Sequence, residues 1–273
     1  MTTYAFPPGG LPSQNENPEG TAVFTEAYAV LPAITQRDIV TSFFPGWLSA
    51  KAWILARPLT GFAQTFAQYA VELAPGGGSA EPEPEITAQA AIFVAFGSVR
   101  LSIGGAREDL VAGHFAFIPA GARWEIWNTS DEPAGFHWIR KRHEPIETTL
   151  NPLEAFVRHE SDVPSNPMPD TNGVWATQRF FDPFDLRYDF HVNIVNFQPG
   201  GRIPFAETHV MEHGLYVLQG TGRYLLNKDW VDVGPGDFMW LRAFCPQACI
   251  ATGDEPFRYL LYKDVNRHPP LGL

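Results

Sequence analysis

Three side chains able to bind a metal ion lie close together in the last third of the chain. Glu207 and His209 are two residues apart, and His213 follows at the same parity. Residues two apart on a strand point to the same face, so one carboxylate and two imidazoles would converge there. This donor set is typical of a divalent metal site. The alternative, a solvated polar strand face, is disfavoured because Ile203 and Phe205 indicate an interior segment, where a carboxylate needs a partner.

The same region belongs to the second copy of an internal repeat. Residues 97–140 align with residues 220–263 at a constant offset of 123 (220 − 97), without a gap. The matching clusters are Gly97 with Gly220, Gly113-His-Phe115 with Gly236-Asp-Phe238, and Asp131-Glu-Pro133 with Asp254-Glu-Pro256. Self-similarity at a single offset predicts two copies of one domain.

Both copies have the sequence pattern of β structure. Short segments rich in β-branched and aromatic residues, each bounded by Gly or Pro, lie at 91–103, 114–120, 189–197, 213–226, 237–243 and 257–263. Such segments at intervals of about ten residues are typical of a sandwich or barrel. We therefore predict an all-β protein of two domains, 1–150 with an N-terminal arm and 151–273. The polar segment between them is expected to contain one helical turn at 152–158.

The composition disfavours several classes of partner. The chain has 273 residues and a formal net charge of −11, which argues against nucleic acid and against an anionic membrane surface. It has no apolar run long enough to span a bilayer, and its first twenty residues lack the basic and apolar regions of a signal peptide. The only cysteines, Cys245 and Cys249, are expected to be reduced. These features favour a cytoplasmic protein that acts on a small molecule.

The spacing of the candidate metal ligands resembles the first of two sequence motifs of the cupins, a family of small β-barrels. That motif is G-x5-H-x-H-x3-E-x6-G. This chain has the same spacing, with Glu and His exchanged at the two ends, at Gly201, Glu207, His209, His213 and Gly220. The second cupin motif begins at Gly236, and its ligand position falls on Gln247. The resemblance implies a bicupin, with two tandem cupin barrels (jelly rolls) in one chain.

The first copy keeps the cupin spacing without the ligands. Its four ligand positions hold Pro84, Ile86, Ala90 and Trp124, none of which binds a metal. We therefore expect one metal ion per chain, in the C-terminal barrel, and a structural role for the first barrel in folding and subunit contacts.

A narrower resemblance rests on the sequence Glu-x-His-x3-His followed by Gln. Over residues 190–267 the chain resembles the (S)-ureidoglycine aminohydrolase family, bicupin enzymes of purine (allantoin) breakdown. The resemblance implies a homo-oligomeric hydrolase that converts (S)-ureidoglycine and water into (S)-ureidoglycolate and ammonia. It implies Mn(II) bound by Glu207, His209, His213 and Gln247, and substrate contacts from Tyr224, Tyr259 and Lys263.

Tyr259 and Lys263 are four residues apart on one predicted strand and so share a face. A lysine directed inward beside a metal is a candidate acid/base or carboxylate clamp, which makes these two residues the catalytic candidates. The alternative is that Lys263 extends to the barrel rim and Tyr259 packs in the core. Cys245 and Cys249 flank Gln247 at equal offsets, which predicts that they share its face.

Two other functions remain open from the sequence. One is a different metal-dependent cupin activity, such as an Fe(II) dioxygenase, which Gln247 in place of a histidine disfavours. The other is a non-catalytic cupin that binds a small ligand, which the intact ligand set of the second copy disfavours.

Overall fold

The computed structural model describes residues 22–36, 42, 44–58, 62–146 and 152–265. The prediction about a signal peptide concerns residues outside these ranges. Within them the structure is built from strands, with two short 3-10 turns, η1 (Ala33–Thr35) and η4 (Glu160–Asp162). The prediction of an all-β protein is therefore confirmed. No helix in these ranges is both long and apolar enough to cross a bilayer.

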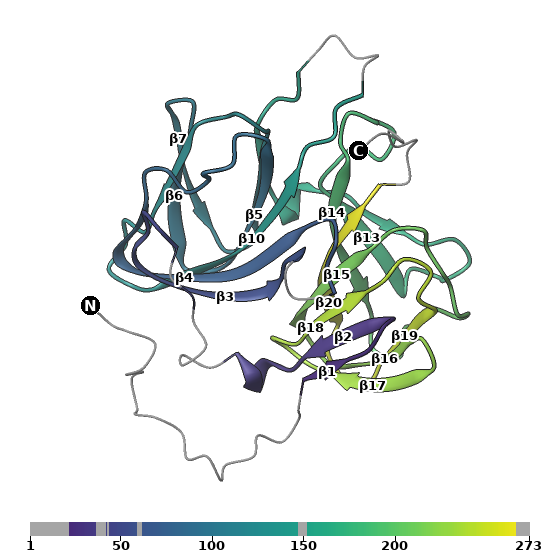
Figure 1. Ribbon diagram of the computed structural model, residues 1–273. Coiled ribbons are helices and arrows are strands. Elements are labelled where there is room, and N and C mark those ends of the chain that lie inside the picture. Colours follow the sequence, from purple (N-terminus) through teal and green to yellow (C-terminus); the bar gives the residue numbers. More distant parts are fainter. Residues whose placement is uncertain (1–21, 37–41, 43, 59–61, 147–151, 266–273) are drawn as a thin grey trace. The chain divides into compact units, whose positions relative to one another are not determined.

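The chain divides into two compact units (Figure 1). Unit 1 comprises Met1–Phe24, Ala29–Arg142 and Glu154–Asp162, and unit 2 comprises Thr25–Tyr28, His143–Leu153 and Val163–Leu273. The sequence suggested a single division after residue 150. In the structure, short segments on either side of that point are exchanged between the units.

The sheet of unit 1 has the strand order β11-β8-β5-β10-β4-β9-β6-β7, and β3 pairs with β4. The strands are β3 (Leu48–Ala56), β4 (Ala67–Ser79), β5 (Ala88–Phe96), β6 (Ser98–Ile103), β7 (Ala106–Val111), β8 (His114–Ile118), β9 (Trp124–Trp127), β10 (Ala134–Arg142) and β11 (Phe156–His159). Part of the predicted N-terminal arm, β3, is therefore a strand of this sheet.

The helical turn predicted at 152–158 is wrong. Phe156 begins β11, which pairs antiparallel with β8 and places Phe156 opposite Phe117. The two rings pack with their centroids 5.6 Å apart. This long-range pairing explains why Glu154–Asp162 belongs to unit 1, because the strand covers an otherwise open sheet edge.

In unit 2 the larger sheet contains β18, β15, β20, β14, β13 and β12 in that order, and β17-β16-β19 form a second sheet. The bounds are β12 (Ser165–Pro167), β13 (Trp175–Arg179), β14 (Phe190–Phe197), β15 (His213–Gln219), β16 (Gly222–Leu226), β17 (Asp229–Val233), β18 (Phe238–Leu241), β19 (Gln247–Ala251) and β20 (Phe257–Asp264). The N-terminal strands β1 (Val23–Phe24) and β2 (Tyr28–Leu31) pair with each other.

The repeat detected in the sequence is also visible in the backbone. Gly97 and Gly220 both have a φ of +70°, and each splits one predicted strand segment into two strands. A Cβ atom at either glycine would collide with the carbonyl oxygen of the repeat-related Pro133 or Pro256. Only glycine fits such a turn without strain, which accounts for its presence in both copies.

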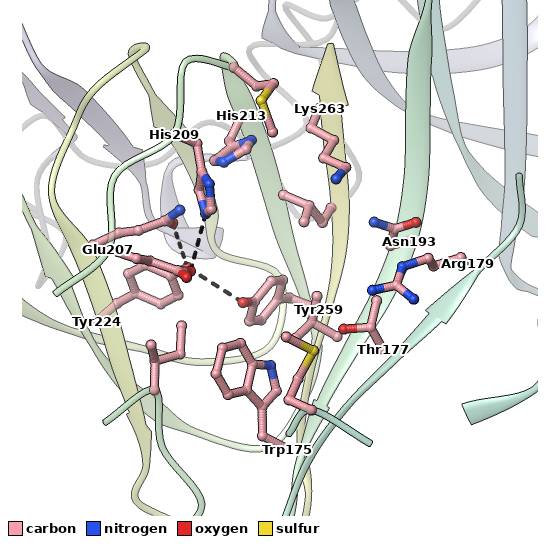
Figure 2. Close-up of a pocket in the computed structure, with 16 residues that line it drawn as sticks. Trp175, Thr177, Arg179, Asn193, Glu207, His209, His213, Tyr224, Tyr259 and Lys263 are labelled. Atoms are coloured by element: carbon pink, nitrogen blue, oxygen red, sulfur yellow. Dashed lines mark hydrogen bonds and ion pairs between the residues drawn. The ribbon is translucent and has the colours of Figure 1, made fainter. Parts of the chain in front are cut away.

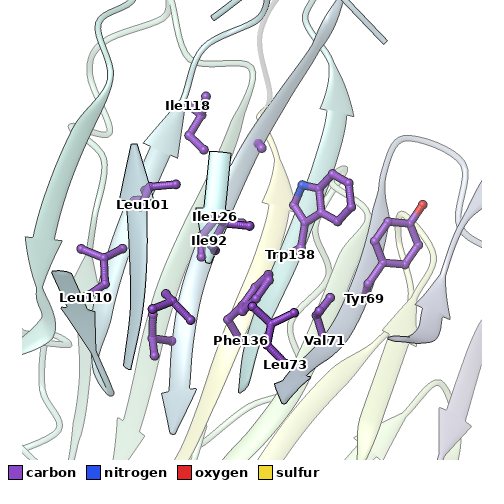
Figure 3. Packing of buried hydrophobic residues seen from close by; sticks show 14 of the residues in the cluster. Tyr69, Val71, Leu73, Ile92, Leu101, Leu110, Ile118, Ile126, Phe136 and Trp138 are labelled. Carbon is purple, nitrogen blue, oxygen red and sulfur yellow. The ribbon is translucent and has the colours of Figure 1, made fainter. Parts of the chain in front are cut away.

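Apolar side chains, mostly aliphatic with a group of aromatic rings around Trp138, fill the interior of unit 1 (Figure 3). The Trp138 ring lies 5.4 Å from Tyr69, 5.5 Å from Trp47 and 5.7 Å from Trp124, measured between centroids. Of the first copy's ligand positions, Ala90 and Trp124 belong to this core, whereas Ile86 is 77% exposed. Side chains thus occupy the interior at two of the four positions that hold candidate ligands in the second copy.

Candidate functional site

A cavity of about 140 Å³ in unit 2 brings the predicted site residues together (Figure 2). Its lining includes all seven of them, namely Glu207, His209, His213, Tyr224, Gln247, Tyr259 and Lys263. They come from the segment before β15 and from strands β15, β16, β19 and β20. The barrel strands therefore gather side chains that are up to 56 positions apart in the sequence, Glu207 to Lys263.

The segment that carries Glu207 and His209 is not the regular strand that their spacing suggested. Glu207 forms an isolated β-bridge with Gln247, through backbone hydrogen bonds of 2.9 and 2.8 Å. The Phe244 N–H donates to the carbonyl oxygen of His209 at 2.6 Å. Phe205, expected inside, is 58% exposed. These backbone bonds, and not a continuous strand, position the two side chains.

The candidate metal ligands lie near one another, but they do not have the geometry of a complete metal site. Glu207 Oε1 lies 3.3 Å from His209 Nε2, and the rings of His209 and His213 are 5.3 Å apart between centroids. Among the described residues, no group of three or more His, Cys, Asp or Glu side chains meets the geometry of a metal site. The fourth candidate ligand, Gln247, is an amide and not a member of these residue types.

His213 provides the observation that fits a metal. Its Nδ1 atom is buried and has no hydrogen-bond partner among the described residues. Burial, together with the nearby charges of His209 and Lys263, lowers the pKa of His213 to about 3. The imidazole is therefore neutral at pH 7 and keeps the lone pair that a metal ligand needs.

Tyr224 fixes the amide of Gln247, and Tyr259 lies beside Tyr224. Tyr224 Oη donates to Gln247 Oε1 at 3.0 Å and lies 3.4 Å from Tyr259 Oη. Burial raises the pKa of both phenols well above the ordinary value, so both remain hydrogen-bond donors at neutral pH. The Gln247 oxygen is thereby held toward the cavity that Glu207 also lines.

Lys263 lies on β20, opposite His213 of β15 and His191 of β14. Figure 2 shows its side chain among the residues that line the cavity. Burial, and then the charge of Arg179, lower the pKa of the Lys263 ammonium. Among the described residues, no hydrogen bond or ion pair holds this ammonium, so it is available to a ligand.

The prediction that the cysteines share the face of Gln247 holds for Cys249, which lies two residues along the same strand, β19, and not for Cys245. Neither Cys245 nor Cys249 lines the cavity. Cys245 lies in the turn before β19, where strand parity does not apply, and Cys249 is fully buried opposite Tyr224. Burial raises the pKa of both thiols, which keeps them protonated and unreactive.

One side of the cavity was not foreseen from the sequence. Strands β13 and β14 contribute Trp175, Thr177, Arg179 and Asn193 to the lining. Trp175, Thr177 and Arg179 alternate along β13, so they share its inner face. The alternating spacing of these residues was the signal available in the sequence. It identifies a cavity lining only once the strands that pair with β13 are known.

The fold and the site together define the class of protein. The Cupin domain model matches the chain twice, over residues 69–140 and 193–262. These segments correspond to the two copies of the repeat, and the second contains the predicted site residues from Glu207 to Tyr259 and ends one residue before Lys263. The chain therefore belongs to the cupin family.

Within that family, the chain is similar to proteins with a common name. It is 33% identical over 237 residues to the Oryza sativa subsp. japonica protein named "Probable (S)-ureidoglycine aminohydrolase", covering 86% of this chain and 73% of that protein. It is 30% identical to the Arabidopsis thaliana (S)-ureidoglycine aminohydrolase, covering 86% and 76%. A solved structure from Pseudomonas aeruginosa, named as a glyoxylate-induced protein, is 55% identical with a TM-score of 0.88 and covers 100% of both chains.

Proposed function

We propose that the protein is an (S)-ureidoglycine aminohydrolase. It hydrolyses (S)-ureidoglycine to (S)-ureidoglycolate and ammonia in purine catabolism, breaking the bond between the central carbon and its amine and forming a bond to water oxygen. The observation that carries this proposal is the single cavity lined by all seven residues that match the family pattern. The names of the relatives support it.

We propose further that Glu207, His209, His213 and Gln247 hold one Mn(II) ion. Two oxygen and two nitrogen donors suit this metal, and the unpartnered His213 nitrogen supports the assignment. When bound, such an ion supplies Lewis-acid stabilisation of developing negative charge.

The remaining residues bind and orient the substrate. Tyr224 positions the Gln247 amide through their 3.0 Å hydrogen bond. Tyr259 donates its phenolic hydrogen to the Tyr224 oxygen, 3.4 Å away, and its ring, which lines the cavity, orients the bound substrate. Lys263 Nζ either moves a proton at the reacting amine or clamps the substrate carboxylate, and its partial burial excludes water from that contact.

The test is ammonia release from freshly prepared (S)-ureidoglycine. Mn(II)-loaded protein should release ammonia faster than the spontaneous reaction, and chelator-treated protein should not, with activity returning on addition of Mn(II). A dioxygenase would instead consume oxygen with another substrate, and a non-catalytic cupin would leave the spontaneous rate unchanged. Either result with the loaded protein would contradict the proposal.

We expect one tightly bound metal ion per chain. The ligand set at Glu207, His209, His213 and Gln247 faces a cavity, whereas Ala90 and Trp124 of the first copy lie in a packed core. Elemental analysis of the purified protein measures the ratio. Two tightly bound ions per chain would show that the structural role assigned to the first barrel is wrong.

A further inference from the structure

The cavity of unit 2 contains more positive than negative charge. Of the described residues that line it, Arg179 and Lys263 are cationic and Glu207 is the carboxylate. Glu207 Oε1 lies 3.3 Å from His209 Nε2 and belongs to the proposed metal site. A bound divalent ion would add to the positive charge. The cavity therefore favours a ligand that carries a negative charge.

The two cations stand at different distances from the proposed metal site. His213 of β15 is opposite Lys263 of β20, whereas Arg179 lies on β13, on the far side of β14. Arg179 pairs with Asn193, and Asn193 pairs with Leu261, so Arg179 and Leu261 are two strand spacings apart, about 10 Å. Figure 2 shows Lys263 beside His213 and Arg179 further from it. A ligand of a few atoms can therefore contact both cations.

Arg179 has no counter-ion within the protein. Its partly buried guanidinium forms no hydrogen bond or ion pair with any residue in the part of the chain that the structure describes. Two carboxylates of the loop after β13 have other partners. Asp182 Oδ1 accepts the Phe184 N–H at 2.9 Å, and Asp185 Oδ2 accepts from Arg187 at 2.6 Å. Arg179 therefore offers its donors to whatever enters the cavity.

The charge of Arg179 acts on the groups around it. Burial, and then Arg179, lower the pKa of Lys263, while the opposing effects of Asp264 and Glu207 are smaller. Burial, and then the charges of Lys263 and Arg179, lower the pKa of His191 to about 4, so this imidazole is neutral at pH 7. The repulsion between the two cations is relieved when an anion lies near both.

Unit 1 compensates the corresponding cation internally. Arg140 aligns with Lys263 at the repeat offset of 123 (263 − 140). It forms a bidentate ion pair with Glu83, whose side chain is 7% exposed, and donates to Tyr69 Oη at 3.3 Å. Glu83 aligns with Ala206 at the same offset (206 − 83), so the second copy has no carboxylate at this position. In unit 2 a ligand can supply the acid that unit 1 supplies itself.

The shape of a guanidinium selects the group that binds it. Its planar fork matches a carboxylate through two parallel N–H···O bonds, whereas an ammonium such as that of Lys263 is a point charge without this geometry. The proposed substrate carries a carboxylate and the reacting amine on the same carbon. Arg179 is thus better suited to hold the carboxylate, with the amine toward Lys263.

We propose that Arg179 holds the substrate carboxylate in a bidentate ion pair and so makes the site specific for small α-substituted acids. With the carboxylate at Arg179, Lys263 Nζ is left to act at the reacting amine. The inference therefore decides between the two roles open for Lys263. It deepens the proposed function and rests on it.

Two unreactive probes test this assignment by direct binding. N-carbamoylglycine has the ureido and carboxylate groups of the substrate without its amine, and N-carbamoylglycinamide replaces the carboxylate by a neutral carboxamide of similar size. Titration calorimetry with Mn(II)-loaded wild-type protein should show the acid binding on the order of tenfold or more tightly, because hydrogen bonds to charged groups are stronger than neutral ones. Every variant is also loaded with Mn(II), so the metal's own attraction for the acid is common to all samples.

The variants should differ in this preference for the acid. Arg179→Met should reduce it on the order of tenfold, while the amide still binds and so reports a folded site. Arg179→Lys keeps the charge without the fork and should retain part of the preference. Lys263→Met should change it by less than about threefold, because a charge that does not touch the carboxylate acts through a higher effective dielectric. The matched control is Arg223→Met, which removes an arginine whose side chain is 56% exposed in the same unit and should change neither constant.

The outcomes decide the assignment. An Arg179→Met variant that keeps the wild-type preference, or a wild type that shows none, would overturn it. An equal loss of affinity for both probes in Arg179→Met would also overturn it, since the guanidinium would then contact the ureido group that they share. If Arg179→Met does not fold, Lys263→Met decides, because loss of the preference there assigns the carboxylate to Lys263 and its retention supports Arg179.

Ammonia release separates this inference from the proposed function. If the protein releases ammonia from (S)-ureidoglycine but the preference does not depend on Arg179, only the role of Arg179 is wrong. If the preference depends on Arg179 but no ammonia is released, the carboxylate site stands and the proposed reaction is wrong.

Discussion

The Glu207→Ala variant is expected to lose its metal and its turnover while keeping its fold. Loss of a residue that merely supports a ligand lowers metal affinity about 10–100-fold, so loss of a charged ligand should lower it further. The fold should survive, because Glu207 is tied to Gln247 by backbone hydrogen bonds that alanine also makes.

Elemental analysis and circular dichroism of the purified variant test this expectation together. Asp232→Ala is the matched control, since the Asp232 side chain is 84% exposed and its loss should leave metal content and turnover unchanged. Full metal content and turnover in Glu207→Ala would mean that Glu207 is not a ligand and that the exchanged motif was misinterpreted.

The Lys263→Met variant should separate chemistry from metal binding. A protonated ammonium has no lone pair and is not a ligand, so Mn(II) content should be normal. Methionine keeps most of the side-chain volume, so stability should be near normal. If Lys263 transfers a proton, kcat should fall on the order of 10²–10⁴-fold.

Steady-state kinetics distinguish the two roles left open for Lys263. A carboxylate clamp would appear mainly as a raised KM, whereas an acid or base would lower kcat. Lys228→Met, at an exposed turn of the same unit, is the control for loss of a charge. Unchanged kcat and KM in Lys263→Met would remove Lys263 from the proposed machinery.

Local sequence patterns predicted the repeat and the barrel strands well, because glycine geometry and strand alternation are local. Gly113 and Gly236 illustrate this. They have φ values of +90° and +89°, and each N–H donates at 2.9 Å to a repeat-related valine carbonyl, Val94 or Val217. The strand β11 was missed because its partner, β8, lies about forty positions earlier. A local sequence pattern carries no information about a pairing at that distance.

The site was predictable only where a motif marks it. The spacing of Glu207, His209 and His213 identified a cavity lining, even though the strand assumed for the first two does not form. Arg179 and Asn193 have no such spacing. Their proximity arises from the pairing of β13 with β14, which is a property of the sheet and not of either segment.

The polar lining of the cavity in unit 2 has a consequence for how this protein tolerates change. Both units bury polar atoms without partners, Gln68 Oε1 and Trp138 Nε1 in unit 1 and Asn193 Oδ1 and His213 Nδ1 in unit 2. In unit 2 these atoms belong to residues that line the cavity. Selection for heat resistance alone would replace such residues by apolar ones that fill the space. The second barrel would then gain rigidity as it lost its capacity to recognise a ligand.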